Sequence, residues 1–235
     1  MSMCRRRARG AMIVTCVTLL LLGLGTPAYA AGGGGGGGGA AGGAQSGGKK
    51  QRALAAYKKG ENAKLRGVKA LQAAAEIEDP EAKQEALDEA DKYFRRALRD
   101  FKKATRTDRR FHQAYNEVGF AERMLGNYEA AIEAYDKALE LEPGFPHAIE
   151  YRGEAYMRLG QLEEAKQAYM QLFANDRPLA DMLMRKMTAW VKLQRRTQDG
   201  GPRDDLDAFA TWIQERSEIA QQTAALTAGA EPHAW

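Results

Sequence analysis

Apolar side chains recur every three to four residues along most of the chain, which is the spacing that gives a helix one apolar face. Asp79 and Pro80 precede one such stretch and have the character of a helix N-cap and a first-turn proline. No segment shows the sustained alternation of a strand bounded by hairpin turns. We therefore predict an all-α fold. Outside the central part of the chain, the spacing predicts helices over 50–76, 80–107, 179–197 and 203–222.

The central part of the chain contains an internal repeat of 34 residues. Residues 112–145 align with residues 146–179 at nine identical positions. Each copy holds two apolar helical segments, here called A and B. They are separated by Leu125-Gly126 in the first copy and Leu159-Gly160 in the second, with glycine where a helix commonly ends in a left-handed residue.

Two adjacent copies with this period resemble the tetratricopeptide repeat family. The first copy reads Tyr115-x2-Val118-Gly119, and the second reads Ile149-x2-Arg152-Gly153. The resemblance implies a right-handed solenoid of about four antiparallel helix hairpins, with glycine where helices A and B approach closely and tyrosine filling the gap to the next hairpin. The residues expected to pack the repeats are Gly119, Ala131, Tyr135, Ala138, Pro143, Gly153, Tyr156, Ala165 and Tyr169.

The segments on both sides of the two clear copies are expected to complete the solenoid. The segment 80–107 aligns with helix B of the first copy, and 50–76 is then its A partner, with Gly60 at the close-approach position. A last hairpin follows over 179–222. Because each repeat buries its apolar face only against a neighbour, four hairpins over 49–222 form a stable array, whereas two would be marginal.

The resemblance also implies that the A helices line a concave groove in which a protein or peptide partner docks. The alternative is that each groove position is an ordinary solvated surface residue. The groove positions are Gln113, Asn116, Phe120 and Arg123 in the first copy, and His147, Glu150, Glu154 and Met157 in the second. We expect most of the binding specificity from Asn116, Phe120, Arg123, Glu150, Glu154 and Met157.

Residues 1–30 have the pattern of an export signal. A basic stretch over 5–9 precedes an apolar stretch over 11–24, and Ala28-Tyr29-Ala30 is a small-x-small cleavage pattern. The apolar stretch is shorter than the roughly 20 residues that span a bilayer. We therefore predict cleavage after Ala30 and a mature chain without a transmembrane span, with an uncleaved signal acting as an anchor as the alternative.

Low-complexity and cysteine-free sequence follows the signal. The Gly-rich segment 31–48 is predicted to be a flexible linker, and 223–235 a disordered tail. The only cysteines are Cys4 and Cys16, so the mature chain has no thiol that an oxidising compartment would affect. An exported bacterial protein of the periplasm fits these features best, and secretion remains an alternative.

Charge is unevenly distributed along the mature chain. The formal charge of +4 lies in the arginines of the signal, which leaves 31 basic and 31 acidic groups after residue 30. Residues 31–110 carry a net charge of +7, and residues 111–235 carry −7. Three interpretations stay open: a surface for anionic envelope polymers or lipid headgroups, a solvated helix face paired with neighbouring acids, and head-to-tail self-association. The basic face comprises Arg95, Arg96, Arg99, Lys102, Lys103 and Arg106.

The chain lacks the sequence patterns of enzymes and of nucleic-acid-binding proteins. No phosphate-binding loop, nucleophile elbow, zinc-protease motif or dinucleotide fingerprint occurs, and no base-reading motif accompanies the arginines. His112 and His147 have no third residue at metal-ligand spacing. We therefore expect no metal, no cofactor and no enzymatic activity, against the rival of a cryptic hydrolase. The sequence predicts a non-catalytic protein-binding scaffold or adaptor of the cell envelope.

Overall fold

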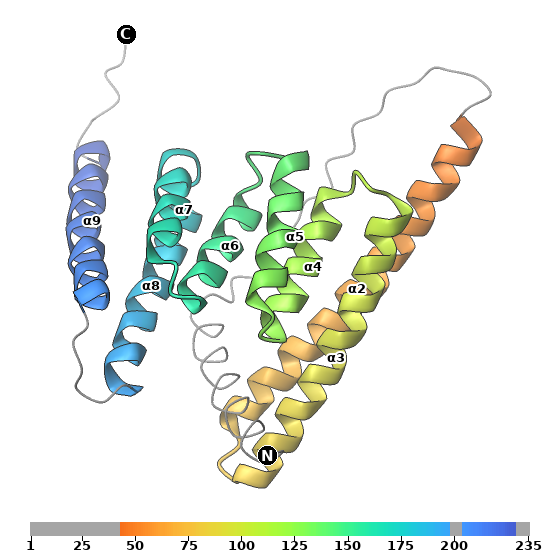
Figure 1. Cartoon of the computed structure of the whole chain (residues 1–235), viewed down its shortest axis with the longest axis horizontal. Coiled ribbons are helices and arrows are strands. Elements are labelled where there is room, and N and C mark those ends of the chain that lie inside the picture. The colour runs from red at the N-terminus through yellow and green to blue at the C-terminus, as the bar shows by residue number, and fades with distance from the viewer. Residues whose placement is uncertain (1–42, 198–203, 229–235) are drawn as a thin grey trace.

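A computed structural model describes residues 43–197 and 204–228. Every regular element in these two ranges is a helix, in agreement with the predicted all-α fold. The helices, labelled as in Figure 1, are α2 (Gly43–Glu76), α3 (Pro80–Thr107), α4 (His112–Met124), α5 (Tyr128–Leu141), α6 (Pro146–Arg158), α7 (Leu162–Asn175), α8 (Arg177–Thr197) and α9 (Asp204–Ala228).

The helices form four antiparallel hairpins that stand side by side in a row (Figure 1). The long pair α2 and α3 lies at one end of the row, and α8 and α9 lie at the other. Consecutive hairpins pack on each other through α3 and α4, α5 and α6, and α7 and α8, while the A helices α4, α6 and α8 also contact in sequence. The prediction of a solenoid of four hairpins is confirmed for the described residues.

Local signals fix the ends of several helices. The Ala82 backbone N–H donates to Oδ2 of Asp79 at 2.7 Å, which confirms Asp79 as the N-cap of α3. Gly126 and Gly160 have φ values of +80° and +73°, and each closes the turn after an A helix. Because side chains disfavour this backbone region, the two turns require glycine or a similarly tolerant residue.

Small residues let the two helices of a hairpin approach closely. A Cβ atom added at Gly119 would lie 2.5 Å from Cε1 of Tyr135, and one at Gly60 would lie 2.5 Å from Cε1 of Phe101. Gly60 therefore occupies the same place in the first hairpin as Gly119 in the second, as predicted. At Gly153 the added atom would lie 3.0 Å from Leu183 and 3.1 Å from Ala168, so this glycine serves the neighbouring helices α7 and α8.

Most of the expected packing residues are buried, whereas Pro143 is exposed and Tyr156 is half-buried. Ala131, Tyr135 and Ala138 are fully buried against α6. Tyr135 has its ring centroid 6.1 Å from that of Tyr151 on α6, and Tyr169 has its ring 5.5 Å from Trp212 on α9. Each tyrosine thus reaches the next hairpin.

The outer boundaries of the helical array differ from those predicted. Helix α2 begins at Gly43, so residues 43–48 of the predicted linker are helical. Helix α9 continues to Ala228, six residues beyond the predicted end of the domain at 222. The predicted signal over 1–30, the rest of the linker and the end of the predicted tail lie outside the described residues.

Candidate functional site: the A-helix face and the basic cleft

Four charged side chains from three A helices form a buried ion cluster. Nη1 of Arg123 on α4 lies 2.7 Å from Oε2 of Glu154 on α6. Nζ of Lys186 on α8 lies 2.5 Å from both Oε1 of Glu154 and Oε1 of Glu150. All four side chains are less than 9% exposed. With two cations and two carboxylates, the cluster is neutral when fully ionised and ties α4, α6 and α8 together.

The two carboxyl groups of the cluster differ in acidity. Burial raises the pKa of Glu150 to about 7, because Lys186 compensates for it only in part and Glu154 repels the second charge. Burial also opposes ionisation of Glu154, but Arg123 and Lys186 together outweigh it and lower its pKa to about 2. Glu150 is therefore the group in this cluster that takes up a proton near neutral pH.

A second set of ion pairs connects α2 to α4. Nζ of Lys64 lies 2.7 Å from Oε2 of Glu117 and 2.7 Å from Oε1 of Glu61. Burial opposes the charge of Lys64, yet these two carboxylates raise its pKa. Together with the buried ion cluster, these contacts connect all four A helices in sequence.

Aromatic rings lie between the cations of these two sets. Phe120 has Nζ of Lys64 and Cζ of Arg123 each 5.4 Å from its ring centroid. Tyr151 has Cζ of Arg123 at 5.2 Å and Nζ of Lys186 at 5.8 Å. Such contacts stabilise a buried cation that its carboxylate partners only partly neutralise.

The residues predicted to line the groove occupy two different environments. Six of the eight are buried, so they form the floor of the A-helix face instead of being displayed to a partner. This differs from the expectation that they supply binding specificity. Gln113 and His147, both at the second position of their repeat, are half-buried. The six buried residues are Asn116, Phe120, Arg123, Glu150, Glu154 and Met157.

The two histidines serve as packing groups. The ring centroid of Phe145 lies 5.1 Å from that of His112 and 6.0 Å from that of His147. Burial lowers the pKa of both histidines, which keeps them neutral at pH 7. Within 43–197 and 204–228, no group of three His, Cys, Asp or Glu side chains is placed to hold a metal ion.

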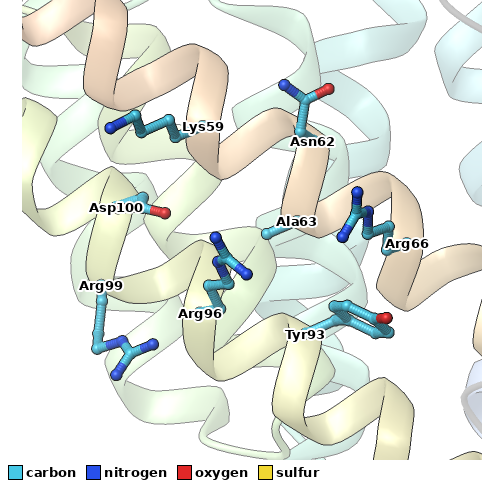
Figure 2. Close-up of a pocket in the computed structure, with 8 residues that line it drawn as sticks. All are labelled: Lys59, Asn62, Ala63, Arg66, Tyr93, Arg96, Arg99 and Asp100. Carbon is cyan, nitrogen blue, oxygen red and sulfur yellow. The ribbon is translucent and has the colours of Figure 1, made fainter.

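The predicted basic face is exposed, and part of it lines a cleft between α2 and α3. The cleft has a volume of about 400 Å³. Figure 2 shows side chains from both helices around the buried Ala63, with Arg96 extending from α3 toward α2. Lys102 pairs with Glu122 and Arg95 with Asp91, as expected for a solvated helix face. The residues that line the cleft are Lys59, Asn62, Ala63, Arg66, Tyr93, Arg96, Arg99 and Asp100.

One comparison with known protein families agrees with the repeat geometry. Residues 123–187, which run from the end of α4 into α8, match a family model described as tetratricopeptide repeat. Over these residues the chain is similar to tetratricopeptide repeats. No curated protein matches it. The crystal structure of MamA is similar to it, with 22% identity, a TM-score of 0.39, and coverage of 59% of this chain and 80% of that one.

The tetratricopeptide repeats suggest a protein-interaction scaffold, and proteins of this family are generally non-catalytic. In the parts of the chain that the structure describes, no helix is both long and apolar enough to cross a membrane.

Proposed function

We propose that this tetratricopeptide repeat protein is a non-catalytic scaffold of the cell envelope that docks a protein partner along the exposed edge of its A helices. One observation carries the proposal. The A helices of four hairpins are connected by buried and half-buried ion pairs into one continuous face. A face whose side chains are fixed in this way is a pre-organised surface, which lowers the entropy that the scaffold itself loses when a partner binds.

The edge of this face follows from the register of the repeats. Taking Gly60, Gly119 and Gly153 as equivalent positions places Leu54, Gln113 and His147 in one row, six residues before each glycine. A further step of 34 residues adds Asp181 on α8.

Two features make this row suited to docking. Leu54 is 45% exposed and Asp181 is also exposed, so the row ends in accessible side chains at both sides. Leu65 follows Leu54 by three turns of α2 and is 53% exposed. The row therefore combines apolar anchors on α2 with polar groups on α4, α6 and α8, a composition that suits a mixed peptide segment.

Two sequence features support an envelope location for the scaffold. The signal-like segment 1–30 directs export, and the sequence after Cys16 contains no cysteine that an oxidising compartment would modify. Cleavage after Ala30 releases the scaffold into the periplasm, whereas secretion or an uncleaved anchor are the alternative outcomes.

A crosslinking experiment in living cells tests the docking edge. A photo-reactive amino acid is placed at Leu54, His147 or Asp181, and at the exposed Glu133 on helix α5 as the matched control. We expect the same crosslinked protein partner from the three edge positions and none from Glu133. Crosslinks from Glu133 alone, or from none of the four positions, would contradict docking at this edge.

A second candidate function is binding of an anionic envelope polymer or membrane surface through the basic face. The observation that favours it is that Lys59 and Arg66 of α2 join Arg96 and Arg99 of α3 around one cleft. Sedimentation with anionic lipid vesicles or with peptidoglycan in moderate salt tests it. Binding that is lost when Arg96 and Arg99 are changed to Glu would support this function, and equal binding by the native protein and this variant would exclude it.

A further inference from the structure

Helix α3 carries a stripe of charged residues along its outer side. Members of the stripe are spaced alternately by four and three residues, so they lie on one side of the helix. All are exposed, and their sign changes once along the helix, from two acidic residues to four basic residues. The stripe consists of Glu85, Glu89, Lys92, Arg96, Arg99 and Lys103.

The two halves of the stripe line two adjoining clefts. The acidic cleft has a volume of about 560 Å³ and is lined by Glu85, Asp88, Glu89, Lys92 and Tyr93. The basic cleft is the one shown in Figure 2, and Tyr93 lines both. The acidic cleft also includes Lys92 and the basic cleft includes Asp100, but the net charges of the two clefts are opposite and therefore complementary.

The charges of the two clefts are poorly neutralised within the chain. Of the described residues, none forms an ion pair with Lys59, Arg66, Arg96 or Arg99. The helix dipole of α3 acts on charges in its first and last turns, and Glu85, Glu89, Arg96 and Arg99 lie outside those turns. It does not account for Lys59 and Arg66, which lie on α2 and add to the basic end. Carboxylates from a second molecule would neutralise part of this basic charge.

We propose that this outer face of α2 and α3 pairs with the same face of a second copy of the chain, antiparallel about a two-fold axis near Tyr93. In a two-fold pair, each contact from one copy is repeated by the other. The acidic cleft of each copy then lies over the basic cleft of its partner. The guanidinium groups of Arg96 and Arg99 match carboxylates as two-donor forks, which favours Glu85 and Glu89 as their counterparts.

The position and size of the face define what kind of dimer forms. Helices α2 and α3 stand at the end of the row of hairpins, so a second copy can approach without displacing a repeat (Figure 1). The stripe from Glu85 to Lys103 is about 27 Å long at 1.5 Å per residue, which places the contact at the small end of specific interfaces. Exposed charge pairs are screened by salt, so the dimer is expected to be weak and to dissociate as ionic strength rises.

This pairing goes beyond the proposed scaffold function and does not depend on it. The stripe lies on a B helix, whereas the proposed docking row lies on the A helices. A dimer would present two docking rows at once, which increases the avidity for a partner that has two binding segments.

Sedimentation equilibrium of the purified processed protein tests the proposal with two charge-reversal variants. One variant carries Arg96→Glu with Arg99→Glu, and the other carries Glu85→Lys with Glu89→Lys. We expect the native protein to dimerise at low salt and each variant to associate at least tenfold more weakly. An equimolar mixture of the two variants should regain dimers, because their altered faces are complementary again.

Matched controls separate pairing from folding and from net charge. Glu129→Lys with Glu133→Lys on α5 changes the net charge by the same amount as the second variant and should leave the dimer intact. Circular dichroism checks the helicity of each variant. If the variant with Arg96→Glu and Arg99→Glu does not fold, two other measurements decide whether the faces pair. These are the association of a variant with Arg96→Gln and Arg99→Gln, and the salt dependence of the native dimer.

Several results would overturn the proposal. A native protein that is monomeric at about 100 µM in low salt would do so, as would a dimer that both charge reversals leave unchanged. Two monomeric variants that do not combine would show that the faces do not pair with each other. A mass that keeps growing beyond the dimer would indicate open-ended head-to-tail association of the +7 and −7 segments instead.

Discussion

Replacing Glu150 by Gln is predicted to stabilise the protein near pH 8, although it removes one partner of a buried ion pair. Glu150 is fully buried, and its Oε2 atom has no hydrogen-bond partner among the residues that the structure describes. Lys186 keeps Glu154 as a partner after the change, so no cation is left unpaired. The change leaves two cations sharing one carboxylate, but the raised pKa of Glu150 already includes its attraction to Lys186, so the neutral side chain still avoids the cost of the buried carboxylate.

The magnitude follows from the pKa of Glu150. In the folded protein this pKa is about 7, against an ordinary value of 4.5. Between these two values the folded state binds more protons than the unfolded state, so this carboxyl makes the protein less stable as the pH rises from 4.5 to 7. At about 1.4 kcal/mol per pKa unit, the ionised carboxylate costs on the order of 3 kcal/mol above pH 7. The neutral amide of Gln avoids this cost.

Urea unfolding followed by circular dichroism measures the effect. We expect Glu150→Gln to unfold with a free energy about 3 kcal/mol higher than the native protein near pH 8, and with nearly the same free energy near pH 4.5. Glu129→Gln on the exposed side of α5 is the control and should change the free energy by less than about 0.5 kcal/mol at either pH. A Gln variant that is less stable than the native protein near pH 8 would refute this reasoning.

Two further substitutions test the packing and capping of the hairpins. Gly119→Ala places a Cβ atom 2.5 Å from the buried ring of Tyr135, so it should lower the free energy of unfolding by about 1–3 kcal/mol. Gly144→Ala is the control, because its added Cβ atom enters open space and should not change this free energy. An unchanged melting temperature for Gly119→Ala would contradict the close approach. Asp79→Ala removes the acceptor for the Ala82 N–H and should cost about 1 kcal/mol in urea unfolding, an expectation that fails if the variant unfolds at the native midpoint.

The parts of the fold that the sequence predicts are those with local signals. Gly119 and Gly60 each lie at the point where the two helices of a hairpin approach closely, so the glycine in the sequence indicates the contact directly. Gly126 and Gly160 mark turns through their own backbone conformation. The helical stretch 43–48 has no such signal, since glycine is a poor helix former and composition alone predicts a flexible chain.

The candidate site was less predictable because its contacts cross between hairpins. Lys186 forms ion pairs with Glu150 and Glu154, which lie 36 and 32 residues before it in the sequence. Nothing near Lys186 in the sequence distinguishes it from a solvated lysine. The family register correctly places Glu150 and Glu154 on the A helices. It does not reveal that neighbouring A helices supply their counter-ions and thereby remove them from the accessible surface.

Hydrogen exchange of the protein in complex with its crosslinked partner tests the central claim most directly. If the protein is a scaffold that docks partners on its A helices, the partner should slow amide exchange at the start of α4 and α6, around Gln113 and His147, and in the exposed half of α2 around Leu54. Helices α5 and α7 should exchange at the same rate with and without the partner. Protection confined to α5 and α7, or to the basic cleft between α2 and α3, would contradict the account.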